Sequence, residues 1–298
     1  MNIYNSSRWP HLLMIIFTMI IAGSFPVVAA ITTGIDSVLL TFWRFLTATL
    51  IFGTMLPLVK NGKRKPGWRD IGRYSIVGGS YGLFFVLMFQ SLKTTSPLNT
   101  STIYTTLPLF TIILGSFLGE TFRIRQLWVL ALSMVATLWV IFRGNVSLML
   151  GLEFNQGDII FFLGTLCLAI YLLSMKKLQR DESKIHFTFY SLLFATLVLM
   201  ITAIFRTGSL AIPDAGTWLG IAYLAGPSTA VTFWILQYTA TRLSPARIVA
   251  YTFLTPSAVA ALEWGMGLSS PDWSVIPGIA ITLAAVFLLQ MEWISGTK

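Results

Sequence analysis

Residues 41–50 read TFWRFLTATL and residues 188–197 read TFYSLLFATL, so one apolar segment occurs twice at an offset of 147 positions. Both versions are nearly continuously apolar and lack the alternating polar residues of a membrane barrel strand. Such a run predicts a membrane helix, because a helix satisfies all of its backbone hydrogen bonds internally. The repetition predicts a chain built from two related halves.

The matches between the halves continue beyond this segment. Chance agreement between apolar helices easily produces matching leucines and alanines, but it does not easily produce matching glutamine, Tyr-Thr and proline. At the same offset, the matching residues are Gly79 with Gly226, Gln90 with Gln237, Tyr104-Thr105 with Tyr251-Thr252 and, after one inserted residue, Pro108 with Pro256. We therefore expect two repeats, residues 1–148 and residues 149–298.

The composition agrees with a membrane protein. Of the 298 residues, 55% are hydrophobic and 10% are charged, against about 45–50% and about 25% in soluble domains. Apolar runs of about 20 residues, long enough to cross a bilayer, occur at 12–33, 37–59, 71–92, 97–118, 126–142, 157–177, 186–205, 217–239, 245–267 and 273–293. We predict an all-α integral membrane protein of ten transmembrane helices. Five helices in each half make the repeats inverted, because an odd number reverses the direction of entry.

The basic residues predict the orientation. If the N-terminus is cytoplasmic, 16 of the 20 Lys and Arg residues lie in cytoplasmic loops, while only Lys93, Arg143 and Arg206 lie in outside loops and Arg44 lies within a span. This bias predicts that both termini are cytoplasmic in a bacterial-type inner membrane. The basic residues that give the net charge of +9 are placed according to the side of the membrane and not along a binding groove, so we expect no nucleic-acid partner.

The first apolar run has a rival interpretation as a secretory signal, since Arg8 precedes it and Ala29 and Ala30 end it. The run is longer than the roughly 7–15 residues of a signal core, which favours a membrane helix. Cys167 is the only cysteine, so an intramolecular disulfide is excluded.

Short motifs in a fixed order resemble those of a known family. They are Trp43-Arg44-Phe45, Leu107-Pro108-Leu109 with Gly119-Glu120, Gly157-Asp158, and the segment from Tyr251 to Pro256. In this order, and over nearly the whole chain, they resemble the EamA-type permeases of the drug/metabolite transporter (DMT) superfamily.

The resemblance implies a fold of five plus five helices and the export or exchange of small metabolites. It also implies that spans 5 and 10 pack outside the transport path or mediate dimers, so we expect a monomer or a homodimer. One departure concerns the glutamate that should match Glu120 in the second half, where Leu268-Ser269-Ser270 stands instead. Glu263 lies earlier in the chain, and transferring a role to it is unsafe.

Arg44 is the first candidate for a substrate contact, because a charge within a span costs about 2.5–3.5 kcal/mol on insertion scales and needs a reason. Eight residues into its span place it about 12 Å from the outer end. Its planar group of donors suits a substrate carboxylate. The alternatives are snorkelling to the outer headgroups and structural pairing.

Glu263 is a candidate for coupling or gating. It either pairs with Arg44 in one state of the transport cycle or titrates with a coupling proton. Its neighbour Trp264 supports the alternative of simple placement at the membrane interface.

The fourth span is rich in polar side chains, namely Asn99, Ser101, Thr102, Thr105 and Thr106. They either hydrogen-bond neighbouring helices or line an aqueous cavity. Pro108 and Pro256 each remove a backbone hydrogen bond, which predicts kinks that serve either gating or static packing.

Gln90 and Gln237 form a symmetric polar pair that faces either a cavity or another helix. Most of the aromatic side chains must pack or face lipid. A few are expected to wall a substrate site for an amphipathic molecule, and the candidates are Trp43, Tyr81, Phe85, Tyr104, Trp234, Tyr238 and Tyr251.

Two other functions compete with transport. A membrane enzyme is disfavoured because its signatures are missing: with only His11 and His186 there is no His-Glu-x-x-His motif, and there is no Gly-x-Ser-x-Gly elbow or phosphate-binding loop. A channel or scaffold is disfavoured by the inverted repeat. We therefore predict secondary transport of a small metabolite such as an amino acid, without a cofactor, in contact with membrane lipid, by alternating access and in exchange for a proton or down a gradient.

Overall fold

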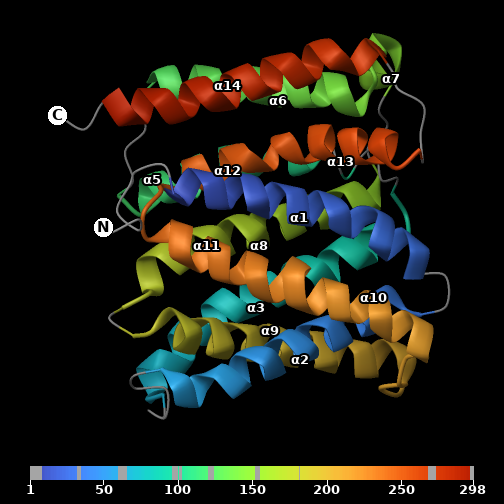
Figure 1. The fold of residues 1–298 in the computed structure, drawn as a ribbon, viewed down its shortest axis with the longest axis vertical. Helices are drawn as coiled ribbons and strands as arrows, with labels where there is room; N and C mark the ends of the chain where they lie inside the picture. The colour runs from blue at the N-terminus through green and yellow to red at the C-terminus, as the bar shows by residue number, and fades with distance from the viewer. Residues whose placement is uncertain are drawn as a thin grey trace.

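A computed structural model of the chain describes residues 9–31, 35–59, 66–95, 100, 103–119, 124–151, 155–180, 182–267 and 273–295. Every regular element in this part of the chain is a helix, which confirms the predicted all-α class there. The long helices run side by side across the molecule (Figure 1). They are α1 Trp9–Ile31, α2 Ser37–Met55, α3 Trp68–Ser91, α5 Leu107–Phe117, α6 Ile124–Ile141, α8 Gln156–Leu178, α9 Lys184–Thr207, α10 Ala215–Ala225, α11 Thr232–Ala240, α12 Pro245–Thr252, α13 Leu254–Gly265 and α14 Ile276–Ser295.

Short elements extend or join these helices. One 3-10 segment, Leu56–Leu58, follows α2, and another, Trp273–Val275, precedes α14. The short helix α7, Val146–Leu150, follows α6. The π-helical turn Gly226–Val231 joins α10 to α11 into one continuous helix.

Five helical segments in the described residues are long and apolar enough to cross a membrane: Ser37–Leu58, Trp68–Ser91, Gln156–Leu178, Lys184–Thr207 and Ala215–Ala240. Shorter apolar helices occupy the positions of the other predicted spans: Trp9–Ser24, Leu107–Phe117, Leu127–Ile141, Ala250–Leu262 and Trp273–Ala284. Ten crossings therefore stay a prediction, of which five meet the length that a bilayer requires.

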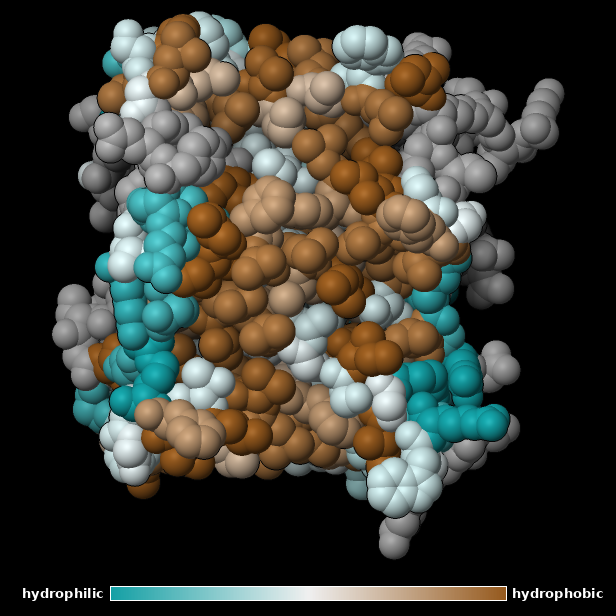
Figure 2. All heavy atoms as spheres, turned by 180° about the vertical axis from the view of Figure 1, so that it is seen from behind, coloured by the Kyte–Doolittle hydropathy of each residue, from teal (hydrophilic) through white to brown (hydrophobic). Residues whose placement is uncertain are grey.

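The surface has the distribution of polarity that a membrane demands. Figure 2 shows a broad hydrophobic area across the middle of one face, with hydrophilic residues gathered toward its left and right edges. Large apolar side chains such as Leu50, Ile159 and Phe205 are exposed, at 61%, 65% and 87%. In water so much exposed apolar surface is unfavourable, whereas in hydrocarbon it is the stable arrangement.

Local signals start the helices where polar residues precede apolar runs. The Asp36 carboxylate accepts hydrogen bonds from the first amides of α2, at 2.9 Å from Val38 and 3.2 Å from Leu39. Asn155 and Asp158 form a reciprocal capping box at the start of α8. Such caps satisfy amides that lack a partner within the helix.

Prolines divide two of the predicted spans. The fourth predicted span turns at residues 105–106 before α5, which carries Pro108 in its first turn. The ninth is interrupted at Phe253, three residues before Pro256. Because proline removes a donor and its ring crowds the preceding turn, a helix breaks just ahead of it. The structure thus interrupts the helices near both prolines, where kinks were predicted, and the gating role of these prolines stays a prediction.

The packing of the helices is symmetric between the halves. α2 packs against α9, and α6 packs against α14, and the members of each pair occupy equivalent places in the two halves. α3 packs against α8 in the same way as their counterparts in the other half, the continuous helix α10–α11 and α1, pack against each other. Figure 1 places α6 and α14 together at one end of the long axis, outside the main bundle, and places the start of α1 and the end of α14 at the same side.

Two glycines allow α3 of the first half to approach α9 of the second half closely. Gly78 and Gly82 on α3 stand one turn apart and face α9, as in the small-residue interfaces of membrane helices. A Cβ atom at Gly78 would overlap the Ser191 carbonyl oxygen, and one at Gly82 would lie 3.0 Å from the Ala195 carbonyl oxygen. The backbones of α3 and α9 therefore touch at these two positions.

Candidate functional site

Arg44 reaches from α2 to the π-helical turn of the second half. Its Nε donates to the Thr229 hydroxyl, and Nη2 donates to the Ser228 carbonyl at 3.0 Å and the Ser228 hydroxyl at 3.3 Å. Ser228 and Thr229 are 1% and 2% exposed. Arg44 is thus bonded inward to a helix of the other half in this structure, whereas the snorkelling alternative would direct it to the outer headgroups.

The π-helical turn explains why the second half can receive this arginine. Gly226 and Pro227 interrupt the regular helix between α10 and α11, since proline has no amide hydrogen to donate. π-Helical turns widen the backbone and often occur at functional sites. Here the turn presents the Ser228 carbonyl to Arg44 while the same carbonyl accepts a hydrogen bond from the Thr232 hydroxyl at 2.8 Å.

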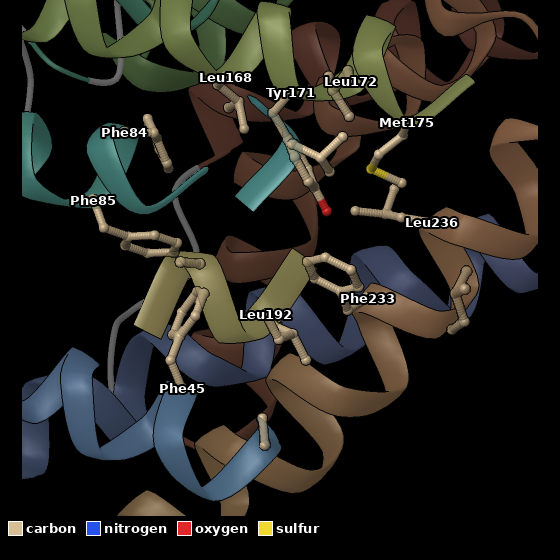
Figure 3. Close-up of a cluster of buried hydrophobic side chains, with 14 of the residues drawn as sticks. Phe45, Phe84, Phe85, Leu168, Tyr171, Leu172, Met175, Leu192, Phe233 and Leu236 are labelled. Atoms are coloured by element: carbon tan, nitrogen blue, oxygen red, sulfur yellow. The ribbon is translucent and has the colours of Figure 1, made fainter. Parts of the chain in front are cut away.

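Five aromatic residues form a connected group that reaches Arg44 through Phe45 and Phe85, and we call them the aromatic cluster. Its members are Phe45, Tyr81, Phe85, Tyr171 and Phe233, from α2, α3, α8 and α11. Figure 3 shows Phe45, Phe85, Tyr171 and Phe233 converging from these different helices. The aromatic cluster therefore draws on both halves of the chain, as does the hydrogen-bonded group around Arg44.

Ring contacts connect the cluster. Tyr81 stacks on Tyr171 with ring centroids 4.2 Å apart, and it lies 5.2 Å from Phe85 and 5.8 Å from Phe233. The central guanidinium carbon of Arg44 is 5.8 Å from the Phe85 ring centroid and 6.0 Å from that of Phe45. These distances place the cation at the limit of cation–π attraction and directly beside an apolar wall.

Two buried polar groups near this wall have no hydrogen-bond partner among the described residues. They are the Tyr171 hydroxyl and the side-chain amide of Gln237, both fully buried. Gln237 stands one helical turn beyond Phe233 on α11, so the two share a helix face. A buried polar group without a partner costs about 1–3 kcal/mol, so both are candidates for contacts with a bound molecule.

Three predicted aromatic candidates lie away from the aromatic cluster. Trp43 donates from its ring nitrogen to the Ala211 carbonyl at 3.0 Å and packs edge-on against Trp218, so it anchors the segment between α9 and α10. Trp234 stacks on Tyr238, and the guanidinium carbon of Arg242 lies 3.7 Å from the Tyr238 ring centroid. None of these printed ring contacts involves a member of the aromatic cluster.

The symmetric polar pair of the sequence is not symmetric in the structure. Gln237 is fully buried, whereas Gln90 is exposed near the end of α3. The two positions therefore differ in burial, and a role in lining a cavity stays a prediction for both. The physical reason is position: Gln90 lies in the last turn of its helix, while Gln237 lies in a helix that is covered on nearly all sides.

The remaining candidates lie on the fourth and ninth predicted spans. Tyr104 packs against the main core, and Thr105 is buried. The Tyr251 hydroxyl is 2.8 Å from Nδ1 of His11, which ties α12 to α1. Asn99 and Thr102 lie outside the described residues, as do the side chains of Pro256 and Glu263.

The predicted Arg44–Glu263 pairing finds no support in the packing of the helices. α13, which carries Glu263, packs against α1 and α6, whereas α2 packs against α9, α10 and the π-helical turn. The pairing would require a different state of the protein.

A charged network that was not predicted lies at the start of α3. Arg73, only 6% exposed, donates to both carboxylate oxygens of Glu182, at 2.7 and 2.8 Å, and to Asp70 at 2.6 Å. The Tyr74 hydroxyl donates to Glu182 at 3.1 Å and lies 3.2 Å from His186 Nδ1. This network joins α3 to the connection between α8 and α9. Sequence reasoning counted Arg73 as a loop residue, and no motif marked its partners.

The environment of Glu182 favours its charged form. Burial raises the pKa of this carboxyl, but hydrogen bonds from Arg73, from the Arg180 backbone and from Tyr74 outweigh burial and hold the pKa below its ordinary value. Glu182 therefore stays an anion that closes this end of the bundle.

Comparisons with known proteins agree over most of the chain. The EamA-like transporter family matches residues 8–142 and again residues 155–291. A protein named "Uncharacterized transporter YyaM" from Bacillus subtilis (strain 168) is 22% identical over 249 residues, which cover 82% of this chain and 81% of that protein. An "Uncharacterized transporter" from Archaeoglobus fulgidus is 24% identical over 287 residues, covering 93% of this chain and 96% of that protein.

A solved crystal structure resembles the fold. It superposes with a TM-score of 0.75 at 17% sequence identity and covers 95% of this chain and 98% of its own. The two family matches leave residues 143–154 between them, and the predicted boundary at 148/149 falls in that interval, within α7.

Proposed function

Because the chain belongs to the EamA-like transporter family, we propose that it is a secondary transporter that exports a small metabolite by alternating access. An amino acid is the first class of metabolite to test. Membership of a transporter family favours transport over the alternative of a membrane enzyme.

The observation that carries this proposal is the bond between Arg44 and the π-helical turn. It joins the first half to the second through Ser228 and Thr229, and the aromatic cluster beside it also comes from both halves. Secondary transporters place their substrate sites between repeats, at irregular helix segments, because rocking of one repeat against the other then exposes the site alternately. Arg44, Tyr81 and Phe85 are the predicted site residues that meet this condition.

The proposed orientation follows from charge. The starts of α3 and α9 and the ends of α8 and α11 meet at one side, through the bonds of Arg73 to Leu178 and of Lys184 to Thr241. Lys176, Lys177, Arg180 and Arg242 lie at this same side. We assign it to the cytoplasm, with both termini on this side of a bacterial-type inner membrane.

The first experiment is a direct transport assay with the purified full chain in lipid vesicles. Vesicles are loaded with labelled amino acids, related metabolites or cationic drugs, and efflux is followed with and without a pH gradient. We expect one class to leave faster than from protein-free vesicles. Equal efflux for every class would contradict the proposal and favour the enzyme or scaffold alternative.

Proton coupling through Glu263 is tested in the same vesicles. If a proton enters as the metabolite leaves, a pH gradient accelerates efflux and Glu263→Gln removes the acceleration. Transport with unchanged pH dependence in Glu263→Gln would exclude that role.

A further inference from the structure

The charge around Arg44 restricts what the site can bind. The five carboxylates whose side chains the structure describes all lie at helix ends or in connections: Asp36, Asp70, Asp158, Glu182 and Asp214. Asp36 is paired with Arg206 at 2.7 Å, and Asp70 and Glu182 are paired with Arg73. Within the described part of the chain, the partners of Arg44 are neutral hydroxyls and a carbonyl.

Arg44 also keeps donors available. Its Nε and Nη2 are bonded to the π-helical turn, while Nη1 donates to no described residue. A charge removed from water is stable only when it is paired and hydrogen-bonded. A carboxylate that meets Nη1 would satisfy both conditions, because guanidinium and carboxylate match in geometry and charge.

The aromatic cluster determines the chemistry that the rest of the ligand must have. The Phe45 and Phe85 ring centroids lie within 6.0 Å of the Arg44 guanidinium carbon, and the stacked pair Tyr81–Tyr171 extends the wall through the contact of Tyr81 with Phe85. The Tyr171 hydroxyl, which has no hydrogen-bond partner among the described residues, is a polar contact that this wall offers. An apolar body with one further oxygen suits such a surface.

An ammonium group suits it poorly. The described carboxylates lie elsewhere, and the Phe45 and Phe85 rings already lie against Arg44, whose charge repels a second cation. From these observations we infer that the transported metabolite is an organic monocarboxylate with an apolar or aromatic body and without an ammonium group, such as a hydrophobic 2-oxo or 2-hydroxy acid. This inference rests on the proposed function and names its substrate class.

Three probes that share one phenylethyl body and differ in charge test which charge the site prefers. They are 3-phenylpropionate, an anion, phenylalanine, a zwitterion, and phenethylamine, a cation. Binding to the purified full chain in detergent is measured by equilibrium dialysis with labelled probes. We expect 3-phenylpropionate to bind at least tenfold more tightly than the other two. Equal or tighter binding of phenylalanine or phenethylamine, or binding of none of the three, overturns the inference.

Substitutions at Arg44 give the second readout. Arg44→Gln should abolish the preference for the anion, and Arg44→Lys should keep the order of the three probes with weaker binding of the anion. Arg69→Gln, at an exposed position of α3, is the matched control and should leave the order unchanged. If Arg44→Gln does not fold, the wild-type order and Arg44→Lys still decide.

Transport distinguishes this inference from the proposed function. Vesicles that release phenylalanine or phenethylamine but not 3-phenylpropionate would overturn the substrate class and leave the transporter proposal intact. Vesicles that release no metabolite of any class would overturn the transporter proposal itself.

Discussion

The side-chain hydroxyls of Thr49 and Thr196 lie 3.0 Å apart within hydrogen-bonding distance, and the two residues are separated by 147 positions, the offset of the sequence repeat. Each hydroxyl also lies 2.8 Å from the carbonyl oxygen four residues earlier in its own helix, the alternative acceptor for its proton. Two equivalent residues can meet only on the axis that relates the halves. The pair therefore places a pseudo-twofold axis between α2 and α9, as a chain of two related halves requires.

The first prediction uses this pair as a cross-link. In a Cys167→Ser background, Thr49→Cys with Thr196→Cys should form an intramolecular disulfide on mild oxidation, because the two side chains meet face to face. Mass spectrometry of the linked proteolytic peptides measures it. Thr47→Cys with Thr196→Cys is the control, since residue 47 points to another side of α2. Equal cross-linking of both pairs would contradict the axis.

A second prediction concerns the contact between α3 and α9. Gly78→Ala should lower stability by about 1–3 kcal/mol, because the new methyl group overlaps the Ser191 carbonyl and the backbones must move apart. Gly79→Ala is a neighbouring control with open space around its Cβ, and helix propensity makes it neutral or stabilising by up to about 1 kcal/mol. Thermal unfolding in detergent compares them, and equal melting temperatures would refute the contact.

The Arg73 network gives the third prediction. Arg73→Gln leaves Glu182 without its bidentate partner in a poorly hydrated position, which we expect to cost on the order of 3 kcal/mol. Unfolding in detergent should show a lower melting temperature than for Arg69→Gln, whose side chain is exposed. Identical stability of the two variants would show that the network contributes nothing.

The pH dependence of that network has a definite sign. Since the pKa of Glu182 is lowered in the folded protein, its contribution to stability is present above about pH 4.3, the ordinary glutamate pKa, and is lost as the pH falls through the lowered value. The difference in melting temperature between wild type and Glu182→Gln should therefore be constant from about pH 5 to 7 and shrink below about pH 4. A difference that grows toward acid would reverse the assignment.

Gln237 allows a test that separates binding from stability. Gln237→Leu removes a buried amide without a described partner, so the free energy of unfolding should rise by about 1 kcal/mol or stay constant, and the melting temperature should not fall. If the amide contacts the metabolite, transport should fall several-fold in the same variant. Gln90→Leu, on the exposed end of α3, should leave transport unchanged. A loss of stability together with transport would assign Gln237 a structural role instead.

The repeat and the helical class were predictable because they depend on patterns that single segments carry. Apolar length marks the candidate spans, five of which the described residues bear out by length, and matched residues such as Gln90 with Gln237 reveal the offset. Arg44 is a candidate for a substrate contact from sequence alone, because a charge inside an apolar run is costly in whichever direction its side chain points. Pro108 and Pro256 marked helix breaks for a local reason, the missing donor.

The partners of Arg44 were not predictable, because they depend on how α2 crosses the second half. Gly226-Pro227 in the middle of an apolar span is the sequence signal for the π-helical turn. Phe45, Tyr171 and Phe233 read as ordinary core residues until packing brings them to Tyr81. The different fates of Gln90 and Gln237 likewise depend on tertiary burial rather than on the repeat.

The central claim is that both halves share one substrate site. Its most direct test is the efflux of the transported metabolite from vesicles that contain Arg44→Gln or Thr229→Val. Arg44 comes from the first half and Thr229 from the second, and they are bonded to each other. We predict that each variant keeps its melting temperature within a few degrees and loses at least tenfold in efflux rate, while Arg69→Gln transports like wild type. Wild-type efflux by either Arg44→Gln or Thr229→Val would contradict the shared site.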